Sequence, residues 1–166
     1  MSVNDAVIAL FLENAARSAA VVHRAEGAEQ LRAKVSEIVG QEGDVFCPLV
    51  TELEKTAAAD RARLVSDYAS ALVTVEEVSA AIAETGSIVC ASSNGKAVQA
   101  SLLPSHHVAI VPCDRIFATL DDFFAGFAAA LPTNLTIITG PSRTADIELN
   151  LVIGVHGPER LDIIVV

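Results

Sequence analysis

The sequence predicts one α/β domain of three layers, in which helices cover both faces of a largely parallel sheet. Short apolar runs alternate along the 166 residues with segments of helical periodicity, and no segment repeats. Hydrophobic residues make up 52% of the chain, mainly Ala, Val, Ile and Leu, and Trp is absent. Strands that are buried on both faces have this aliphatic composition. A chain of this length is within the range of one domain, so we expect residues 1–166 to form a single unit.

The first sixty residues are predicted to be a helical cover for the sheet. Residues 4–17 and 28–39 place apolar side chains at helical spacing, and an Asn or Asp is available to cap the first of these helices. A short strand at 45–47 and a weaker helix at 51–59 follow. No motif in this part indicates a chemical activity.

The rest of the chain, from residue 70 onward, is predicted to be the core that carries the motifs. Strands are expected at residues 71–75, 87–92, 108–111, 135–139 and 161–166. Between the first two strands, Thr74 is expected to cap a helix that Glu76 and Glu77 begin and Gly86 ends, because acidic side chains suit the first turn of a helix.

Two further elements and one turn complete the predicted core. Asn94-Gly95 is a strong local signal for a hairpin turn. A helix at 120–131 carries phenylalanines at core spacing, and a short element is expected at 145–153, before the final strand.

Charge and cysteine content exclude several classes of protein. The formal net charge is −10 and no run of Lys or Arg occurs, so neither nucleic acid nor an anionic membrane is an expected partner. No apolar segment reaches the roughly 20 residues of a membrane span, and no signal-peptide pattern opens the chain. Cys47, Cys90 and Cys113 are widely spaced, which favours reduced, buried thiols in a cytoplasmic protein. A metal or iron–sulfur site shared by them is the weaker alternative.

Polar chemistry is concentrated at residues 140–148, directly after the predicted strand at 135–139. Gly140 and the following Pro turn the chain, and the next residues supply hydroxyls, a guanidinium and carboxylates. If Thr144 caps a helix that starts at residue 145, the free amides of its first turn, with Ser142 and Arg143, would hold a small anion. The alternative is that Arg143 only pairs with a nearby carboxylate. The segment matches neither standard nucleotide-binding loop.

Two histidines and a glycine-rich return are candidates for the other wall of this site. His107 and His156 each lie beside a strand or a turn and could face the loop, although a structural role is the alternative for both. The return at 154–158 includes Gly157, and a sharp turn before the last strand explains it equally well. No histidine spacing predicts a metal site, no pattern supports a covalent nucleophile, and no cofactor is predicted.

Four segments together resemble the LUD-domain family, of the lactate-utilisation protein C (LutC/YkgG) type. They are Ala-Glu-Thr-Gly-Ser at 83–87, Ser-Leu-Leu-Pro at 101–104 with His-Val at 107–108, the loop at 140–148, and Gly-Val-His-Gly-Pro at 154–158. The resemblance implies a NagB/RpiA/CoA-transferase-like fold. It also implies a part in oxidising L-lactate to pyruvate, alongside an iron–sulfur subunit and a cysteine-rich subunit. Ser87 departs from the family, which more often has Thr there, and the first sixty residues carry no match.

The motifs and the resemblance together define a set of candidate ligand-binding residues, whereas catalytic residues stay unknown. The set is Thr85, Gly86, Ser87, His107, Gly140, Ser142, Arg143, Thr144, Asp146, Glu148, His156 and Gly157. Two alternatives stay open: an independent enzyme acting on a sugar phosphate or an acyl-CoA, with Glu84 or Glu148 as its base, and a regulatory or structural role. The oligomeric state, a homo-oligomer included, is also open.

Overall fold

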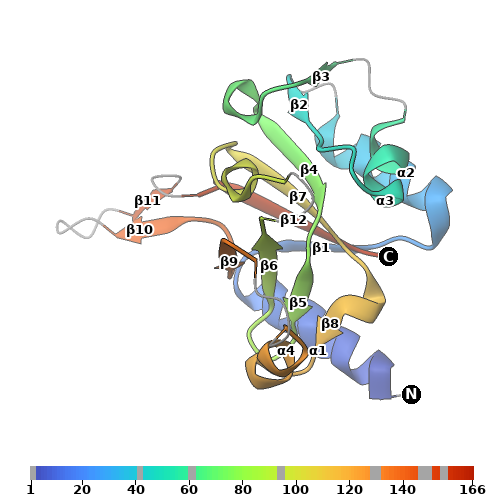
Figure 1. Ribbon diagram of the computed structural model, residues 1–166, viewed down its shortest axis with the longest axis vertical. Coiled ribbons are helices and arrows are strands. Elements are labelled where there is room, and N and C mark those ends of the chain that lie inside the picture. Colours follow the sequence, from blue (N-terminus) through green and yellow to red (C-terminus); the bar gives the residue numbers. More distant parts are fainter. Residues whose placement is uncertain are drawn as a thin grey trace.

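The computed structural model describes residues 3–40, 43–59, 63–92, 96–127, 132–145, 151–153 and 157–166 (Figure 1). Its main feature is a six-stranded sheet in which every neighbouring pair of strands runs parallel. In spatial order the strands are β1 (Val21–Arg24), β12 (Arg160–Val165), β7 (His106–Val111), β4 (Val73–Glu77), β2 (Val45–Phe46) and β3 (Leu64–Val65). This arrangement confirms the predicted α/β class with a largely parallel sheet.

A second sheet, of four strands, shares an apolar core with the first. Its strands, in spatial order, are β8 (Ile116–Phe117), β5 (Ala80–Ile82), β6 (Ser87–Ala91) and β9 (Leu135–Ile138). Strand β6 runs antiparallel to both of its neighbours, whereas β5 and β8 are parallel. Strands β10 (Arg143–Ala145) and β11 (Leu151–Ile153) form an antiparallel ribbon that projects from the body of the molecule (Figure 1).

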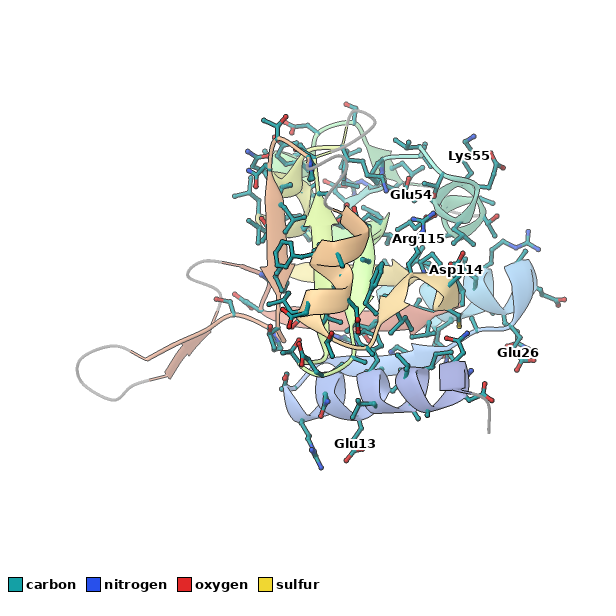
Figure 2. The ribbon with its side chains drawn as sticks, turned by 60° about the horizontal axis from the view of Figure 1, so that its bottom comes forward. Glu13, Glu26, Glu54, Lys55, Asp114 and Arg115 are labelled. Atoms are coloured by element: carbon teal, nitrogen blue, oxygen red, sulfur yellow. The ribbon has the colours of Figure 1, made fainter. Side chains whose placement is uncertain are left out.

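Helices cover both faces of the large sheet. Helix α1 (Val3–Arg17) buries Phe11 against one face and against the small sheet, and Glu13 points away from the body on its outer surface (Figure 2). Helices α2 (Gly27–Val39) and α3 (Glu52–Ala58) pack on the opposite face. Along β7, Ala109 belongs to the α1 side and Ile110 to the α2 side. The strand is therefore buried on both faces, as its unbroken apolar sequence predicts.

Short elements complete the described chain. Helix α4 (Leu120–Phe127) packs Phe123 on the small sheet, and three 3₁₀ turns connect the strands. These turns are η1 (Tyr68–Ser70), η2 (Val98–Ser101) and η3 (Cys113–Arg115). The predicted helices at 4–17, 28–39 and 51–59, and the strands at 87–92, 108–111, 135–139 and 161–166, are confirmed within a residue or two. The helix predicted at 120–131 is confirmed over its described part, 120–127. The Asn94-Gly95 turn and residues 128–131 lie outside the described residues.

The helix predicted between Glu76 and Gly86 is wrong. Glu76 and Glu77 are the last residues of β4, and residues 80–82 form β5. Both carboxylates are buried, and their partners come from distant parts of the sequence: His107 for Glu76 and Arg115 for Glu77. Acidic residues that look like a helix start are here strand residues neutralised by tertiary contacts, which local sequence cannot show.

Besides β5, two strands in the first half of the chain, β1 and β3, were not predicted. Strand β1 is an edge strand with only two apolar residues before His23 and Arg24, which is too short a run to be recognised. Strand β3 is shorter still. The amino-terminal segment thus covers the sheet with helices, as expected, and these helices lie on both faces. It also supplies the strands β1 and β2 of the large sheet.

Candidate functional site

The loop after β9 lines a pocket of about 690 Å³. The pocket lies where this loop meets the end of α1, strand β9 and the return before β12. Its lining residues are Arg17, Ser18, Leu102, Thr136, Ile137, Ile138, Thr139, Gly140, Pro141, Ser142, Gly157 and Pro158. The backbone amide of Ser142 donates a hydrogen bond to the carbonyl of Pro158 over 2.8 Å, so the loop and the return are directly joined. Gly140, Ser142 and Gly157 are therefore brought together around this pocket.

Close packing of Gly140 on α1 brings the end of that helix into the pocket. Gly140 has a φ of +72°, and a Cβ at this position would lie 2.0 Å from the carbonyl oxygen of Ser18. Only glycine allows this approach. As a result Arg17 and Ser18, which carried no sequence signal for function, line the pocket. The contact is made across more than a hundred residues of sequence, so no local pattern could have revealed it.

A chain of hydroxyls links the turn after β5 to the end of β9. The Ser87 hydroxyl lies 2.7 Å from that of Thr85 and 2.7 Å from that of Thr139. Ser87 is buried, whereas Thr139 lines the pocket. Ser87 thus supports the pocket wall from behind through Thr139, and the exposed Thr85 bonds to Ser87 without lining the pocket. A hydroxyl at position 87 is therefore used in this contact.

Gly86 packs against α1 and does not line the pocket. Its φ is +69°, and a Cβ there would lie 2.1 Å from the backbone nitrogen of Ala15. The Asn14 side chain, one turn of α1 from the pocket, donates hydrogen bonds to the carbonyls of Ala83 (2.9 Å) and Glu84 (3.1 Å). This turn is therefore fixed to the helix by backbone contact and by two hydrogen bonds.

The carboxylate of Glu84 lies at the amino end of α4. Its carboxylate accepts a hydrogen bond of 2.6 Å from the backbone amide of Leu120, the first residue of that helix. A carboxylate at a helix amino terminus satisfies a free amide and suits the helix dipole. Glu84 is also absent from the lining of the pocket described above. Its contacts therefore favour a structural role over that of a catalytic base.

The helix expected to begin at residue 145 with Thr144 as its cap is wrong. Residues 143–145 form β10, and Thr144 pairs with Val152 in the antiparallel ribbon. The anion-binding helix terminus proposed from the sequence does not exist at this position. In addition, the Ser142 amide is already bonded to Pro158. Asp146, Glu148 and His156 lie outside the described residues.

His107 lies in a second, buried polar cluster and not among the residues that line the pocket. Its Nε2 is 3.1 Å from Oε1 of Glu76, and the hydroxyl of Ser101 donates to the same oxygen. Burial raises the pKa of Glu76, but the His107 ring, the Ser101 hydroxyl and the Lys96 charge outweigh burial and lower it. Burial, reinforced by the Glu76 carboxylate, raises the pKa of Cys90 well above the ordinary thiol value. Glu76 is therefore ionised, while Cys90 is protonated in the absence of a cation.

A third polar cluster surrounds the buried Asp162 near the amino end of β12. Its carboxylate accepts hydrogen bonds from His23 (2.8 Å), His106 (2.8 Å) and Arg160 (2.7 Å). Burial raises the pKa of Asp162, but the bonds from His106, His23 and Arg160 outweigh burial and lower it from 3.8 to about 2. A carboxyl whose pKa falls on folding stabilises the protein above its unfolded pKa, and this contribution is lost as the pH falls.

Asp162→Asn should remove an acid-sensitive part of the stability. In the unmodified protein, the free energy of unfolding should fall by about 2 kcal/mol between pH 4 and pH 2 through this group alone. The variant should be less stable at neutral pH and should have a flatter pH profile in that window, measured by urea unfolding. Asp114→Asn, at an exposed aspartate, is the control and should keep the original slope. An unchanged slope in Asp162→Asn would contradict this assignment.

Fold and site together define an α/β protein with a parallel sheet between helical layers and a pocket at the loop after β9. The chain belongs to the LUD domain family, whose model matches residues 49–166. Within the described residues, no helix is long and apolar enough to cross a membrane.

Curated relatives agree with this membership, and a solved structure has the same fold. The chain is 38% identical over 110 residues to lactate utilization protein C of Halalkalibacterium halodurans, covering 63% of this chain and 48% of that protein. It is 37% identical over 116 residues to the Bacillus licheniformis protein of the same name, covering 66% and 48%. The chain thus spans about half the length of these relatives. A DUF162 family protein from Deinococcus radiodurans has the same fold, with a TM-score of 0.76, 24% identity and 99% coverage of both chains.

Proposed function

We propose that this chain takes part in lactate utilisation in the cytoplasm, supporting the oxidation of L-lactate to pyruvate together with iron–sulfur and cysteine-rich partner subunits. Family membership and the names of its relatives support this role. The single observation that carries the proposed site is the pocket of about 690 Å³, because the loop that bears the family resemblance lines it. This volume is typical of small-molecule sites.

A small carboxylate is the proposed ligand of this pocket. Arg17 lines it, with hydroxyls from Ser18 and Ser142 and an apolar wall from β9. The Arg17 side chain is 72% exposed and its guanidinium pairs with Glu13 at 2.7 Å, a surface contact that costs little to exchange for a ligand. Arg143 follows Ser142 directly in the chain, and we propose it as the second cation. An arginine can bind a carboxylate through two parallel hydrogen bonds.

Arg17→Ala and Arg143→Ala should each weaken the binding of L-lactate or pyruvate about tenfold or more, since a hydrogen bond to a charged group contributes about 1.5–3 kcal/mol. Ligand-observed NMR titration of the purified chain measures this. Arg63→Ala is the matched control, because Arg63 is 75% exposed, pairs with Asp44 and does not line the pocket. Equal affinities in all three variants and the unmodified chain would overturn the anion site.

The role as a supporting subunit has its own test. The purified chain alone should not oxidise L-lactate, whereas its addition to the iron–sulfur partners should raise their lactate oxidation. Full oxidation by the isolated chain would refute the role. Turnover of a sugar phosphate or an acyl-CoA, lost on changing Glu148, would favour the alternative of an independent enzyme. The oxidation and turnover experiments do not test whether the pocket binds a carboxylate. The proposed role as a supporting subunit and the proposed carboxylate site can therefore be refuted independently.

A further inference from the structure

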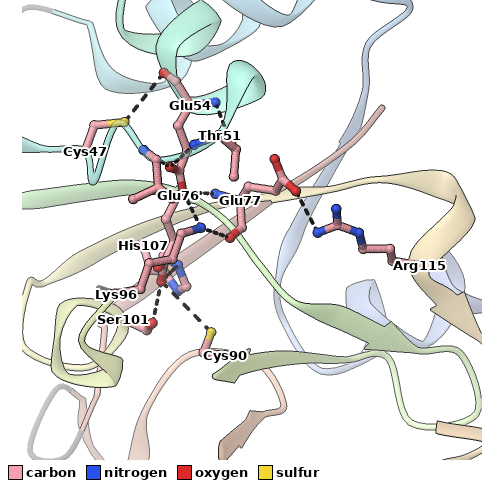
Figure 3. Close-up of polar contacts among 11 residues, drawn as sticks. Cys47, Thr51, Glu54, Glu76, Glu77, Cys90, Lys96, Ser101, His107 and Arg115 are labelled. Atoms are coloured by element: carbon pink, nitrogen blue, oxygen red, sulfur yellow. Dashed lines mark hydrogen bonds and ion pairs between the residues drawn. The ribbon is translucent and has the colours of Figure 1, made fainter. Parts of the chain in front are cut away.

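Three buried side chains of different chemistry meet between the two sheets (Figure 3). Glu76 comes from β4 and His107 from β7 of the large sheet, while Cys90 comes from β6 of the small sheet. One carboxylate oxygen, one ring nitrogen and the thiol sulfur all lie within 4.8 Å of one another. The cluster therefore places three kinds of metal ligand at a junction of elements that are far apart in sequence.

Hydrogen bonding within the cluster does not account for the position of His107. Its Nε2 lies 3.1 Å from the Glu76 carboxylate, yet neither ring nitrogen has a hydrogen-bond partner among the described residues. His107 is fully buried, and a buried polar atom without a partner costs about 1–3 kcal/mol. Nε2 thus lies within ion-pair distance of the carboxylate without making a hydrogen bond, an arrangement that two ligands of one metal ion also have.

Distances within the cluster fit a tetrahedral ion after small side-chain adjustments. Two ligands of one tetrahedral Zn²⁺ lie about 3.3 to 3.8 Å apart, given metal–ligand bonds of about 2.0 to 2.3 Å. The nitrogen–oxygen distance of 3.1 Å and the sulfur–oxygen distance of 4.0 Å lie on either side of this range.

We propose that Glu76, Cys90 and His107 bind one Zn²⁺, which joins the small sheet to the large one. Nitrogen, sulfur and oxygen ligands in a tetrahedral set favour zinc over the hard cations Mg²⁺ and Ca²⁺. One carboxylate, one thiolate and one neutral imidazole also balance the charge of the ion, as a fully buried site requires. The proposal does not depend on a role in lactate utilisation.

Two hydroxyls next to the three ligands complete the proposed site. Ser101 donates to the Glu76 carboxylate and fixes its orientation, as outer-shell partners of metal ligands do. Thr74 is the register partner of His107 and lies two residues before Glu76 on β4, so it faces the same side of the sheet. Its hydroxyl oxygen is buried without a hydrogen-bond partner in the described part of the chain. Thr74 or a water is therefore available as the fourth ligand.

Metal analysis of the refolded 166-residue chain tests the proposal. The protein is unfolded with a chelator, refolded with a small excess of Zn²⁺ or Co²⁺, and desalted. We expect one equivalent of metal per chain, and the cobalt form should show a thiolate-to-cobalt charge-transfer band. Cys90→Ala should abolish that band and lower the affinity by more than about a hundredfold, while Ser101→Ala should lower it by about 10- to 100-fold, as outer-shell changes do.

Cys47→Ala is the matched control, because Cys47 is also a buried thiol but lies outside the cluster. This variant should keep both the metal and the charge-transfer band. Circular dichroism establishes that each refolded variant has native secondary structure. Absence of bound metal from the refolded, unmodified chain would overturn the proposal, whatever the variants do. Equal metal content in Cys90→Ala and Cys47→Ala would overturn it as well.

Discussion

Gly86→Ala is expected to lower the free energy of unfolding by about 2 to 5 kcal/mol, the sum of a left-handed backbone cost and an overpacking cost. The backbone cost arises because φ at Gly86 is +69°. The packing cost arises because the new Cβ would lie 2.1 Å from the backbone nitrogen of Ala15 and 2.6 Å from its Cα. The backbone atoms of Ala15 belong to the hydrogen-bonded last turn of α1 and cannot move aside individually, so this end of the helix would have to shift.

Gly27→Ala separates these two costs. Gly27 has a similar φ of +78°, but no atom lies within 4 Å of the Cβ that the substitution would add. We therefore expect a loss of only about 1–2 kcal/mol, from the backbone alone. Urea unfolding followed by circular dichroism measures both variants. Equal losses in the two would show that the approach of α1 to Gly86 does not contribute. A shift of α1 in Gly86→Ala should also weaken carboxylate binding, because Arg17 and Ser18 lie at the end of this helix.

The contacts at Gly86 and Gly140 show which part of the site the sequence could predict. The apolar run at 135–139 predicted strand β9, and the following Gly-Pro predicted the loop. Both predictions were possible because each signal depends on only a few neighbouring residues. Arg17 and Ser18 join the pocket only because Gly140 allows α1 to touch the loop. Such a contact depends on the packing of whole elements, so no signal for it exists near residue 17.

The error at residues 76–86 has a similar physical origin. Val78, Ala81 and Ile82 fit a helical spacing, and two glutamates before them resemble a first turn. The residues of this segment are buried on two faces, which strands allow, whereas a surface helix keeps one face in water. The glutamates are tolerated in the interior because His107, Ser101 and Arg115 bind them, and these partners follow more than 20 residues later. Tertiary contacts thus outweighed the local preference of this segment for a helix.

Glu54, which no sequence pattern led us to single out, is held by four hydrogen bonds at the centre of another buried network (Figure 3). Its carboxylate accepts from the amides of Val50 (2.8 Å), Thr51 (3.1 Å) and Glu77 (3.0 Å). The fourth donor is the Lys96 ammonium group, at 2.5 Å. Glu54 is fully buried, and it joins the start of α3 to the end of β4.

Glu54→Ala should destabilise the protein by about 3–5 kcal/mol, the cost of leaving one partner of a buried ion pair uncompensated. Three backbone amides and the Lys96 charge would lose their acceptor together. Glu54→Gln should cost less, about 1–3 kcal/mol, because one carbonyl oxygen is kept while the new NH₂ group faces donors.

Glu52→Ala is the matched control for the charge at the start of α3. Glu52 lies on the same helix, but its side chain is 88% exposed and pairs with Lys55 at 2.7 Å. Its loss should stay within about 1 kcal/mol, the range of an exposed pair. Guanidinium unfolding at neutral pH measures the stability of the three variants. We expect Glu52→Ala to be the most stable, Glu54→Gln to be intermediate and Glu54→Ala to be the least stable. Equal stability of Glu54→Ala and Glu52→Ala would show that the four donors are satisfied by water, and that Glu54 does not hold α3 to β4.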